Sequence, residues 1–128
     1  MIKKEKFHIE YVFDKVSVRS LWNHLTTALG LSSWFADEVH ISGARYTFVW
    51  SKEREEAELL DEKPDVRIRF RWRNEDDVDY YFEFLLHHIE LTGATALEIT
   101  DFAEPDEKAD AIARWDSQVK VLKRTLGI

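Results

Sequence analysis

The chain has 128 residues, a length typical of one domain built around one core. With 45% hydrophobic and 34% charged residues, it is too apolar to be disordered and too charged to be embedded in a membrane. The formal net charge of −7 argues against a nucleic-acid partner, because a phosphate backbone requires a basic patch. The absence of cysteine excludes disulfides, a thiol nucleophile and a thiolate zinc site.

No segment of the sequence suggests export or membrane insertion. The first residues are rich in lysine and lack the apolar core of a signal peptide. No apolar run approaches the ~20 residues needed to span a bilayer. We therefore expect a cytoplasmic protein with no membrane insertion.

A strand and two short helices are predicted for the N-terminal quarter of the chain. Residues 6–14 alternate between apolar and polar, which is the period of a half-buried strand. Ser17 suits the N-cap of a first helix, whose end is expected at Gly30. A second helix over residues 31–36 is expected to follow at once and to direct its two aromatic residues inward. The apolar stripe of the first helix consists of Val18, Leu21, Trp22, Leu25 and Leu29.

A run of antiparallel strands is predicted next. Strands over residues 39–42 and 44–50 are followed by a weaker one over 55–60 and by a turn at 63–65. The clearest strand covers residues 66–73, where apolar and basic residues alternate strictly. Its inward residues are Val66, Ile68, Phe70 and Trp72, and its outward residues are Arg67, Arg69, Arg71 and Arg73.

This strand and the next fit one hairpin register. If Arg73 pairs with Asp79, one face collects aromatic pairs and the other collects opposite charges, as cross-strand energetics favour. The arginine row is open to two interpretations, an anion-binding stripe or a solvated, salt-bridged outer face. The second is the better one, because Glu83 and the acidic residues Glu55, Glu56 and Glu58 flank the row. The predicted pairs are Trp72 with Tyr80, Arg71 with Tyr81, Phe70 with Phe82, Arg69 with Glu83, Ile68 with Phe84 and Val66 with Leu86.

A second hairpin is predicted to turn at residues 92–93, and it directs two titratable residues inward. His88, opposite Leu97, is a candidate to orient a ligand carbonyl or to act as a general acid or base. An exposed histidine near the end of the sheet is the simpler interpretation. Asp101, opposite Phe84, either points into a cavity or is turned outward by a bulge, and the second alternative is preferred.

A long amphipathic helix is predicted to follow Pro105, a residue suited to a first helical turn. It should run for roughly 20 residues, about 30 Å. The order of elements predicts an α+β fold, a curved antiparallel sheet with helices on one face. Because such a sheet cannot press flat against a straight helix, an apolar gap is expected between them. The helix stripe consists of Ile112, Trp115, Val119, Leu122 and Leu126.

We expect this gap to be a ligand cavity, the alternative being that the same side chains simply pack as a core. The hydroxyls of Tyr46 and Tyr80 could bond a ligand oxygen there. His87 and His88 do not form a metal pair, because adjacent strand residues point to opposite faces. The sequence predicts no metal and no cofactor. The expected cavity residues are Tyr46, Phe48, Trp50, Phe70, Trp72, Phe82, Phe84, Leu97, Ile99, Trp115, Val119 and Leu122.

Several segments, spread over nearly the whole chain, resemble one family. They resemble the START-like proteins of the SRPBCC superfamily, nearest to the branch related to the activator of the heat-shock-protein-90 ATPase. The resemblance implies one helix-grip domain over residues 1–128, with a deep cavity for lipids, sterols, polyketides or other hydrophobic molecules. Some relatives are cyclases or other enzymes. The matching segments are 20–23, 30–37, 81–84, 90–93 and 99–103, together with Trp115.

Three functions are open on this basis. The first is binding of a hydrophobic small molecule in the cavity. The second is a cyclase or hydrolase that uses His88 or Asp101 as its acid–base group. The third is a protein-interaction module, towards a chaperone or a second copy of the chain as a homodimer. The eukaryotic chaperone activator carries a separate N-terminal domain, for which 128 residues leave no room, so direct chaperone activation is not expected.

Overall fold

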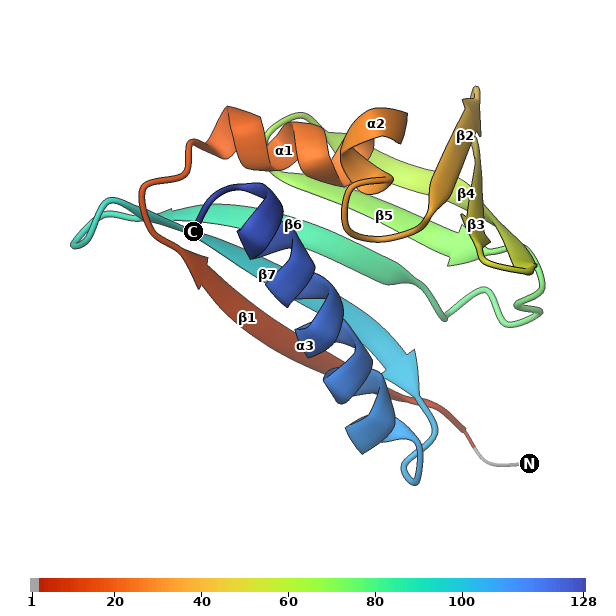
Figure 1. Ribbon diagram of the computed structural model, residues 1–128. Helices are drawn as coiled ribbons and strands as arrows, with labels where there is room; N and C mark the ends of the chain where they lie inside the picture. Colours follow the sequence, from red (N-terminus) through yellow and green to blue (C-terminus); the bar gives the residue numbers. More distant parts are fainter. Residues whose placement is uncertain (1–2) are drawn as a thin grey trace.

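The computed structural model describes residues 3–128, which form a seven-stranded antiparallel sheet and three helices. The strands lie in the order β1-β7-β6-β5-β4-β3-β2. All three helices lie over one face of the curved sheet, with α3 running across β7 and β1 (Figure 1). This is the predicted α+β helix-grip architecture. Its elements are β1 (Glu5–Phe13), α1 (Val18–Thr26), α2 (Ala28–Leu31), β2 (Glu38–Ser42), β3 (Arg45–Trp50), β4 (Glu53–Lys63), β5 (Arg67–Trp72), β6 (Phe82–Ile89), β7 (Ala94–Ala103) and α3 (Lys108–Thr125).

None of the helices formed by residues 3–128 combines the length and apolar character needed to cross a bilayer.

Helices α1 and α2 meet at an elbow that the sequence pattern misplaced. Ser17 caps α1 as predicted, its Oγ accepting the Ser20 N–H at 3.1 Å. The helix ends at Thr26 rather than at Gly30, and the second helix lies at 28–31 rather than 31–36. The cause is Thr27, whose Oγ1 donates to the Asn23 carbonyl at 2.7 Å and accepts the Gly30 N–H at 2.9 Å.

This break rotates the residues that follow it relative to the stripe of α1. Leu29, predicted to continue that stripe, is therefore 83% exposed. Gly30 faces the backbone of α1 so closely that a Cβ there would lie 2.2 Å from the Asn23 carbonyl oxygen. Only glycine fits this approach without moving one of the helices.

The last carbonyls of α1 are bonded by side chains that come from outside the helix. The indole of Trp34 donates to the His24 carbonyl at 2.7 Å, and the hydroxyl of Tyr46 donates to the Thr26 carbonyl at 3.2 Å. A helix end leaves such groups without partners, and burying them unbonded would be costly. The elbow is therefore fixed to the turn after α2 and to β3.

The register of the β5–β6 hairpin confirms the central part of the prediction. Phe70 pairs with Phe82, Arg69 with Glu83 and Ile68 with Phe84, as expected. The Leu86 N–H also bonds the Val66 carbonyl at 2.7 Å. The three outer pairs predicted beyond Phe82 do not form, because β6 begins at Phe82 and residues 73–81 are a loop.

The β6–β7 hairpin turns through four residues, not the predicted two. Ile89 pairs with Ala94, and Gly93 takes a left-handed conformation with φ of 74°. The register is therefore shifted by two residues, so that Leu86, rather than His88, is the partner of Leu97. A shift of two keeps every side chain on its predicted face, which is why the inward residues of β7 remain inward.

Helix α3 begins at Lys108, three residues later than Pro105 suggested. Pro105 instead lies in a preceding turn, which the Glu107 N–H closes by bonding the Glu104 carbonyl at 2.9 Å. In the middle of α3, Asp116 accepts a hydrogen bond from the hydroxyl of Tyr11 at 2.6 Å, so that α3 is bonded to β1. The buried stripe of α3 consists of Ala111, Trp115, Val119 and Leu122, with Ile112 and Leu126 partly buried beside it.

The arginine row of β5 lies on the outer face and forms ion pairs there, of which the one between Arg69 and Glu83 was predicted and the one between Arg67 and Asp61 was not. Arg67 contacts Asp61 at 2.5 Å, Arg69 contacts Glu83 at 3.4 Å, and Arg73 contacts Glu56 at 3.1 Å. A register shift between Leu59 and Asp61 interrupts β4 and changes the face on which its later residues lie.

Candidate functional site

The interior of the grip is filled by Phe35, which follows α2. Its ring centroid lies 4.9 Å from that of Phe48, 5.8 Å from that of Trp115 and 6.2 Å from that of Phe84. Trp34 packs beside it, 5.5 Å away. Both residues point inward as predicted and are at most 5% exposed. Together they occupy the space between the sheet and α3 where a deep cavity was expected.

The remaining hollow lies at one end of the grip, where the start of α3 faces the 73–81 loop and the end of the β3–β4 hairpin. It consists of a cavity of about 500 Å³ and an adjoining one of about 230 Å³, which share Lys4, Trp72, Glu75, Asp101 and Arg114. We call the two together the mouth pocket. The larger cavity is lined by Lys4, Phe35, Trp50, Glu53, Glu55, Trp72, Asn74, Glu75, Asp101, Arg114, Trp115 and Gln118.

Three of the twelve expected cavity residues line the mouth pocket, and all three are tryptophans: Trp50, Trp72 and Trp115. The other nine lie in the packed core and are at most 5% exposed. Contact of any of the twelve with a ligand stays a prediction. The nine are Tyr46, Phe48, Phe70, Phe82, Phe84, Leu97, Ile99, Val119 and Leu122.

The indole rings of the mouth pocket are held in fixed orientations. Trp50 donates its N–H to the Phe35 carbonyl at 2.7 Å, and Gln118 donates to the same carbonyl at 3.1 Å. Trp72 packs on Phe82 with ring centroids 4.9 Å apart. The rings of Trp50 and Trp72 lie 6.2 Å apart at an angle of 57°, so that they form two walls of a corner.

Asp101 points inward, which corrects the preferred prediction that a bulge turns it outward. It pairs with Phe7 of β1 in the sheet, and its Oδ2 accepts the indole N–H of Trp115 at 2.9 Å. Its Oδ1 accepts the Phe102 N–H at 2.8 Å. Burial raises the pKa of Asp101, although the bond from Trp115 opposes this shift. Asp101 is thus a partly desolvated acid at the wall of the pocket.

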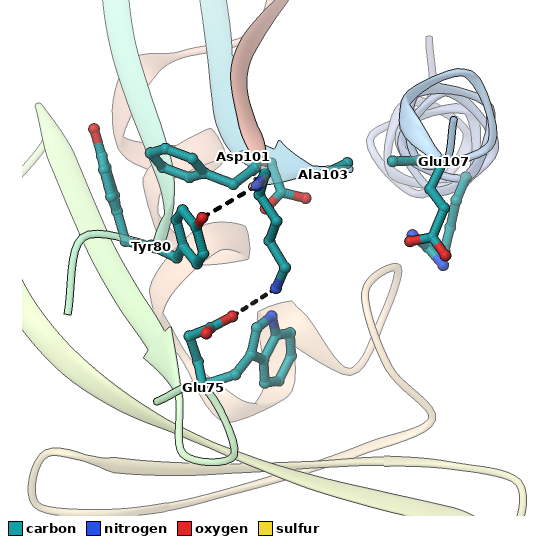
Figure 2. Close-up of a pocket in the computed structure, with 11 residues that line it drawn as sticks. Glu75, Tyr80, Asp101, Ala103 and Glu107 are labelled. Carbon is teal, nitrogen blue, oxygen red and sulfur yellow. Dashed lines mark hydrogen bonds and ion pairs between the residues drawn. The ribbon is translucent and has the colours of Figure 1, made fainter. Parts of the chain in front are cut away.

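An ion pair between the N-terminal strand and the 73–81 loop forms the rim of the pocket. Lys4 Nζ lies 2.5 Å from Glu75, and the Lys4 backbone N–H donates to the hydroxyl of Tyr80 at 3.1 Å (Figure 2). Burial alone would raise the pKa of Glu75, but the bond from Lys4 and the Asp77 N–H lower it. The hydroxyls of Tyr80 and Tyr46, predicted for a ligand oxygen, are therefore bonded to the protein backbone.

The histidine candidate lies away from this site. His88 is exposed and pairs with Thr95, at the opposite end of β6 from Phe82. It does not line the mouth pocket. Across residues 3–128, no group of three or more histidine, aspartate or glutamate side chains is arranged to hold a metal ion.

Apart from Asp101, sequence reasoning missed the charged residues of the pocket, most clearly Glu55. It grouped Glu55 with Glu56 and Glu58 beside the outward arginine row. The β3–β4 register instead places Glu55 opposite Phe48, and Glu53 opposite Trp50, on the inward face. The tight turn after Trp50 was the available signal, because it gives Glu53 the same face as its partner.

The whole chain, residues 1–128, matches the START-like superfamily domain. No curated protein matches it. The solution structure of BfR322 from Bacteroides fragilis is 41% identical, with a TM-score of 0.71, over 99% of this chain and 94% of that one.

Two further solved structures share the fold at low sequence identity. The Aha1 dimer from Colwellia psychrerythraea is 18% identical, with a TM-score of 0.80, over 97% of each chain. DynU16, from the dynemicin biosynthetic locus, is 19% identical, with a TM-score of 0.75, over 95% of this chain and 47% of that one. The match over the full length and the architecture agree: the chain belongs to the START-like superfamily.

Proposed function

We propose that this chain binds an apolar small molecule in the mouth pocket, between the sheet and the first turns of α3. The observation that carries the proposal is a cavity of about 500 Å³ walled by three tryptophans. Sites for small molecules are typically concave, about 300–1,000 Å³ in volume, and lined by aromatic residues with a few polar groups. The mouth pocket has the volume and the aromatic walls of such a site, and eight of the twelve residues that line its larger cavity are polar or charged.

Two further facts support a binding role. The indoles are locked by hydrogen bonds and stacking, so that little side-chain freedom is lost when a ligand docks against them. DynU16, which has the same fold, comes from a biosynthetic locus, a setting in which a small-molecule partner is natural. The residues behind Phe35 form a packed core, so we place the ligand at the mouth.

Ligand titration followed by the indole N–H signals in NMR tests this proposal. A lipophilic ligand should shift the signals of Trp50, Trp72 and Trp115 and leave that of Trp22, which is buried in α1, unchanged. Native mass spectrometry of freshly purified protein would identify the class of any ligand that co-purifies.

A pair of loop variants makes the test specific to the pocket. Asn74→Trp should fill the mouth pocket and abolish the shifts, because Asn74 lines it. The matched control is Asp76→Trp, an exposed position in the same loop that lines neither cavity. Equal binding by both variants would overturn the proposal.

A second candidate is acid–base catalysis by Asp101 on a bound ligand. The observation that favours it is a carboxyl group with a raised pKa at the wall of a pocket, which is how enzymes prepare a general acid. Asp101→Asn should then abolish turnover of the bound ligand while ligand binding survives. Unchanged turnover in that variant would rule this role out.

We also propose that the chain forms a homodimer, by likeness to the Aha1 protein from Colwellia psychrerythraea, which is a dimer. Light scattering coupled to size exclusion measures the mass directly. A mass of 15.2 kDa at all concentrations would contradict a dimer.

A further inference from the structure

We infer that the ligand of the mouth pocket carries a positive charge, as an amine or quaternary ammonium group joined to an apolar body. This inference rests on the proposed function and names the chemical class of its ligand. It follows from three observations: two inward carboxylates, the charges already present in the pocket, and the arrangement of the tryptophans.

The two carboxylates belong to Glu53 and Glu55 of β4. In the β3–β4 register they lie opposite Trp50 and Phe48, on the face of the sheet that is covered by the helices. Burial on this face increases along the strand: Glu53 is exposed, Glu55 is half-buried and Ala57 is fully buried. Within residues 3–128, neither carboxylate lies within 4 Å of a basic side chain.

A neighbouring glutamate shows that this arrangement is not general to the strand. Glu56 lies on the outer face and pairs with Arg73 at 3.1 Å. On the outer face, the next glutamate, Glu58, also has basic cross-strand partners, Arg45 and Arg71, whereas the cross-strand partners of Glu53 and Glu55 are aromatic. A half-buried charge without a partner is unfavourable unless a counter-charge is supplied, and the pocket beside Glu55 leaves room for one.

The larger cavity holds two basic groups, Lys4 and Arg114. Lys4 is paired with Glu75 at 2.5 Å. Arg114 forms no ion pair within 4 Å among residues 3–128, and its charge lowers the pKa of Asp101. Four carboxylates and two basic groups line the larger cavity, so its net charge is negative. Such a pocket attracts cations and repels anions such as fatty-acid carboxylates.

The tryptophans supply a second attraction for the same charge. The faces of Trp50 and Trp72 form a corner, and Trp115 lines the same cavity. A cation over an indole face gains an interaction that corresponds to about 2- to 30-fold in affinity, depending on desolvation. A ligand that places its ammonium group in this corner also approaches Glu53, the partner of Trp50 across the hairpin.

Three probes with the same body test the sign of the charge. They are 4-phenylbutylamine, 4-phenylbutan-1-ol and 4-phenylbutanoate, which are cationic, neutral and anionic at pH 7. Dissociation constants come from the indole N–H shifts of Trp50, Trp72 and Trp115. We expect the amine to bind about tenfold more tightly than the alcohol, and the carboxylate to bind most weakly.

Charge-neutral variants assign the preference to the two glutamates. Glu53→Gln and Glu55→Gln should each reduce the advantage of the amine over the alcohol to about threefold or less. The control Glu56→Gln, on the outer face, should alter neither. Because glutamine has nearly the same size as glutamate, these variants should keep the fold intact, which unchanged backbone NMR signals would verify.

The outcomes separate this inference from the proposed function. Equal binding of amine and alcohol, or tightest binding of the carboxylate, overturns the charge inference and leaves small-molecule binding standing. No shift of the three indole signals with any probe overturns both. An ammonium group could come from a free amine or a lipid headgroup. Tighter binding of dihexanoylphosphatidylcholine than of 4-phenylbutylamine would support the inference with a lipid source, and the reverse would support it with a free amine.

Discussion

The two ends of the grip treat their polar groups in opposite ways. At the closed end, the last carbonyls of α1 are bonded by Thr27, Trp34 and Tyr46, and the aromatic rings are buried in the core. At the mouth, glutamates face the interior without basic partners, and a cavity remains. Completed hydrogen bonds and close packing hold the fold together, while unpaired charge beside empty volume marks where a ligand can act.

Removing the ring that fills the interior of the grip should have the largest effect. Phe35→Ala deletes a side chain that is 4% exposed and contacts the core aromatics. We expect a loss of about 3–5 kcal/mol in the free energy of unfolding, measured by urea denaturation. The control Val78→Ala, at an exposed position, should change it by less than about 0.5 kcal/mol. A loss below about 1 kcal/mol for Phe35→Ala would show that the interior around Phe35 is not tightly packed.

The elbow between α1 and α2 should tolerate no added methyl group. Gly30→Ala places a Cβ 2.2 Å from the Asn23 carbonyl oxygen, so the two helices must separate. The expected cost is about 1–3 kcal/mol of unfolding free energy. Leu29→Ala, one residue earlier and largely exposed, is the control. If both variants unfold at the same denaturant concentration, the close approach does not exist in solution.

At the mouth, stability should depend on pH through Asp101. Burial holds its folded-state pKa above the 3.8 of a free aspartate, so between these values the folded chain binds more protons than the unfolded chain. Stability therefore decreases as the pH rises through that interval. Relative to Asp101→Asn, which cannot titrate, the wild type should be most stable at low pH and lose this advantage as the pH rises. A constant difference between the two proteins would mean that the pKa is not raised.

The rim should show the smallest effect. Lys4→Met removes an ion pair whose lysine is 38% exposed, so at most about 1 kcal/mol of stability is at stake. The sharper readout is the pKa of Glu75, which should rise because burial is then less opposed. NMR titration of the Glu75 carboxyl measures it. Lys120→Met, on the exposed face of α3, should leave that pKa unchanged.

The sequence predicted the fold better than it predicted the position of the site. Alternation gave the β5–β6 register, because one alignment pairs aromatic residues on one face and sets Arg69 opposite Glu83 on the other. The elbow was misplaced because a single threonine hydroxyl serves both helices, and helical spacing alone cannot detect this. Turn length in the β6–β7 hairpin was wrong because several turns fit the residues around Gly93.

The mouth pocket was harder to foresee because its position depends on which side chains fill the interior. Periodicity indicated that Phe35 points inward, but not that it reaches the centre of the grip. The three tryptophans were among the expected cavity residues, since the strand alternation indicates that Trp50 and Trp72 point inward and the helical stripe indicates the same for Trp115. Glu55 was assigned to the wrong face because its neighbours suggested one continuous acidic row.

The register shift at Leu60 has a consequence for how β4 carries its charges. Before it, Glu55, Ala57 and Leu59 lie on the covered face, and without it Asp61 would continue that series. The extra residue turns Asp61 outward, where it meets Arg67. Glu55 and Asp61 are an even number of residues apart and would lie on one face of a regular strand, yet Glu55 faces the pocket and Asp61 faces the solvent side. Deleting Leu60 would exchange the two sides beyond that point, so an indel there should be far less tolerated than a substitution.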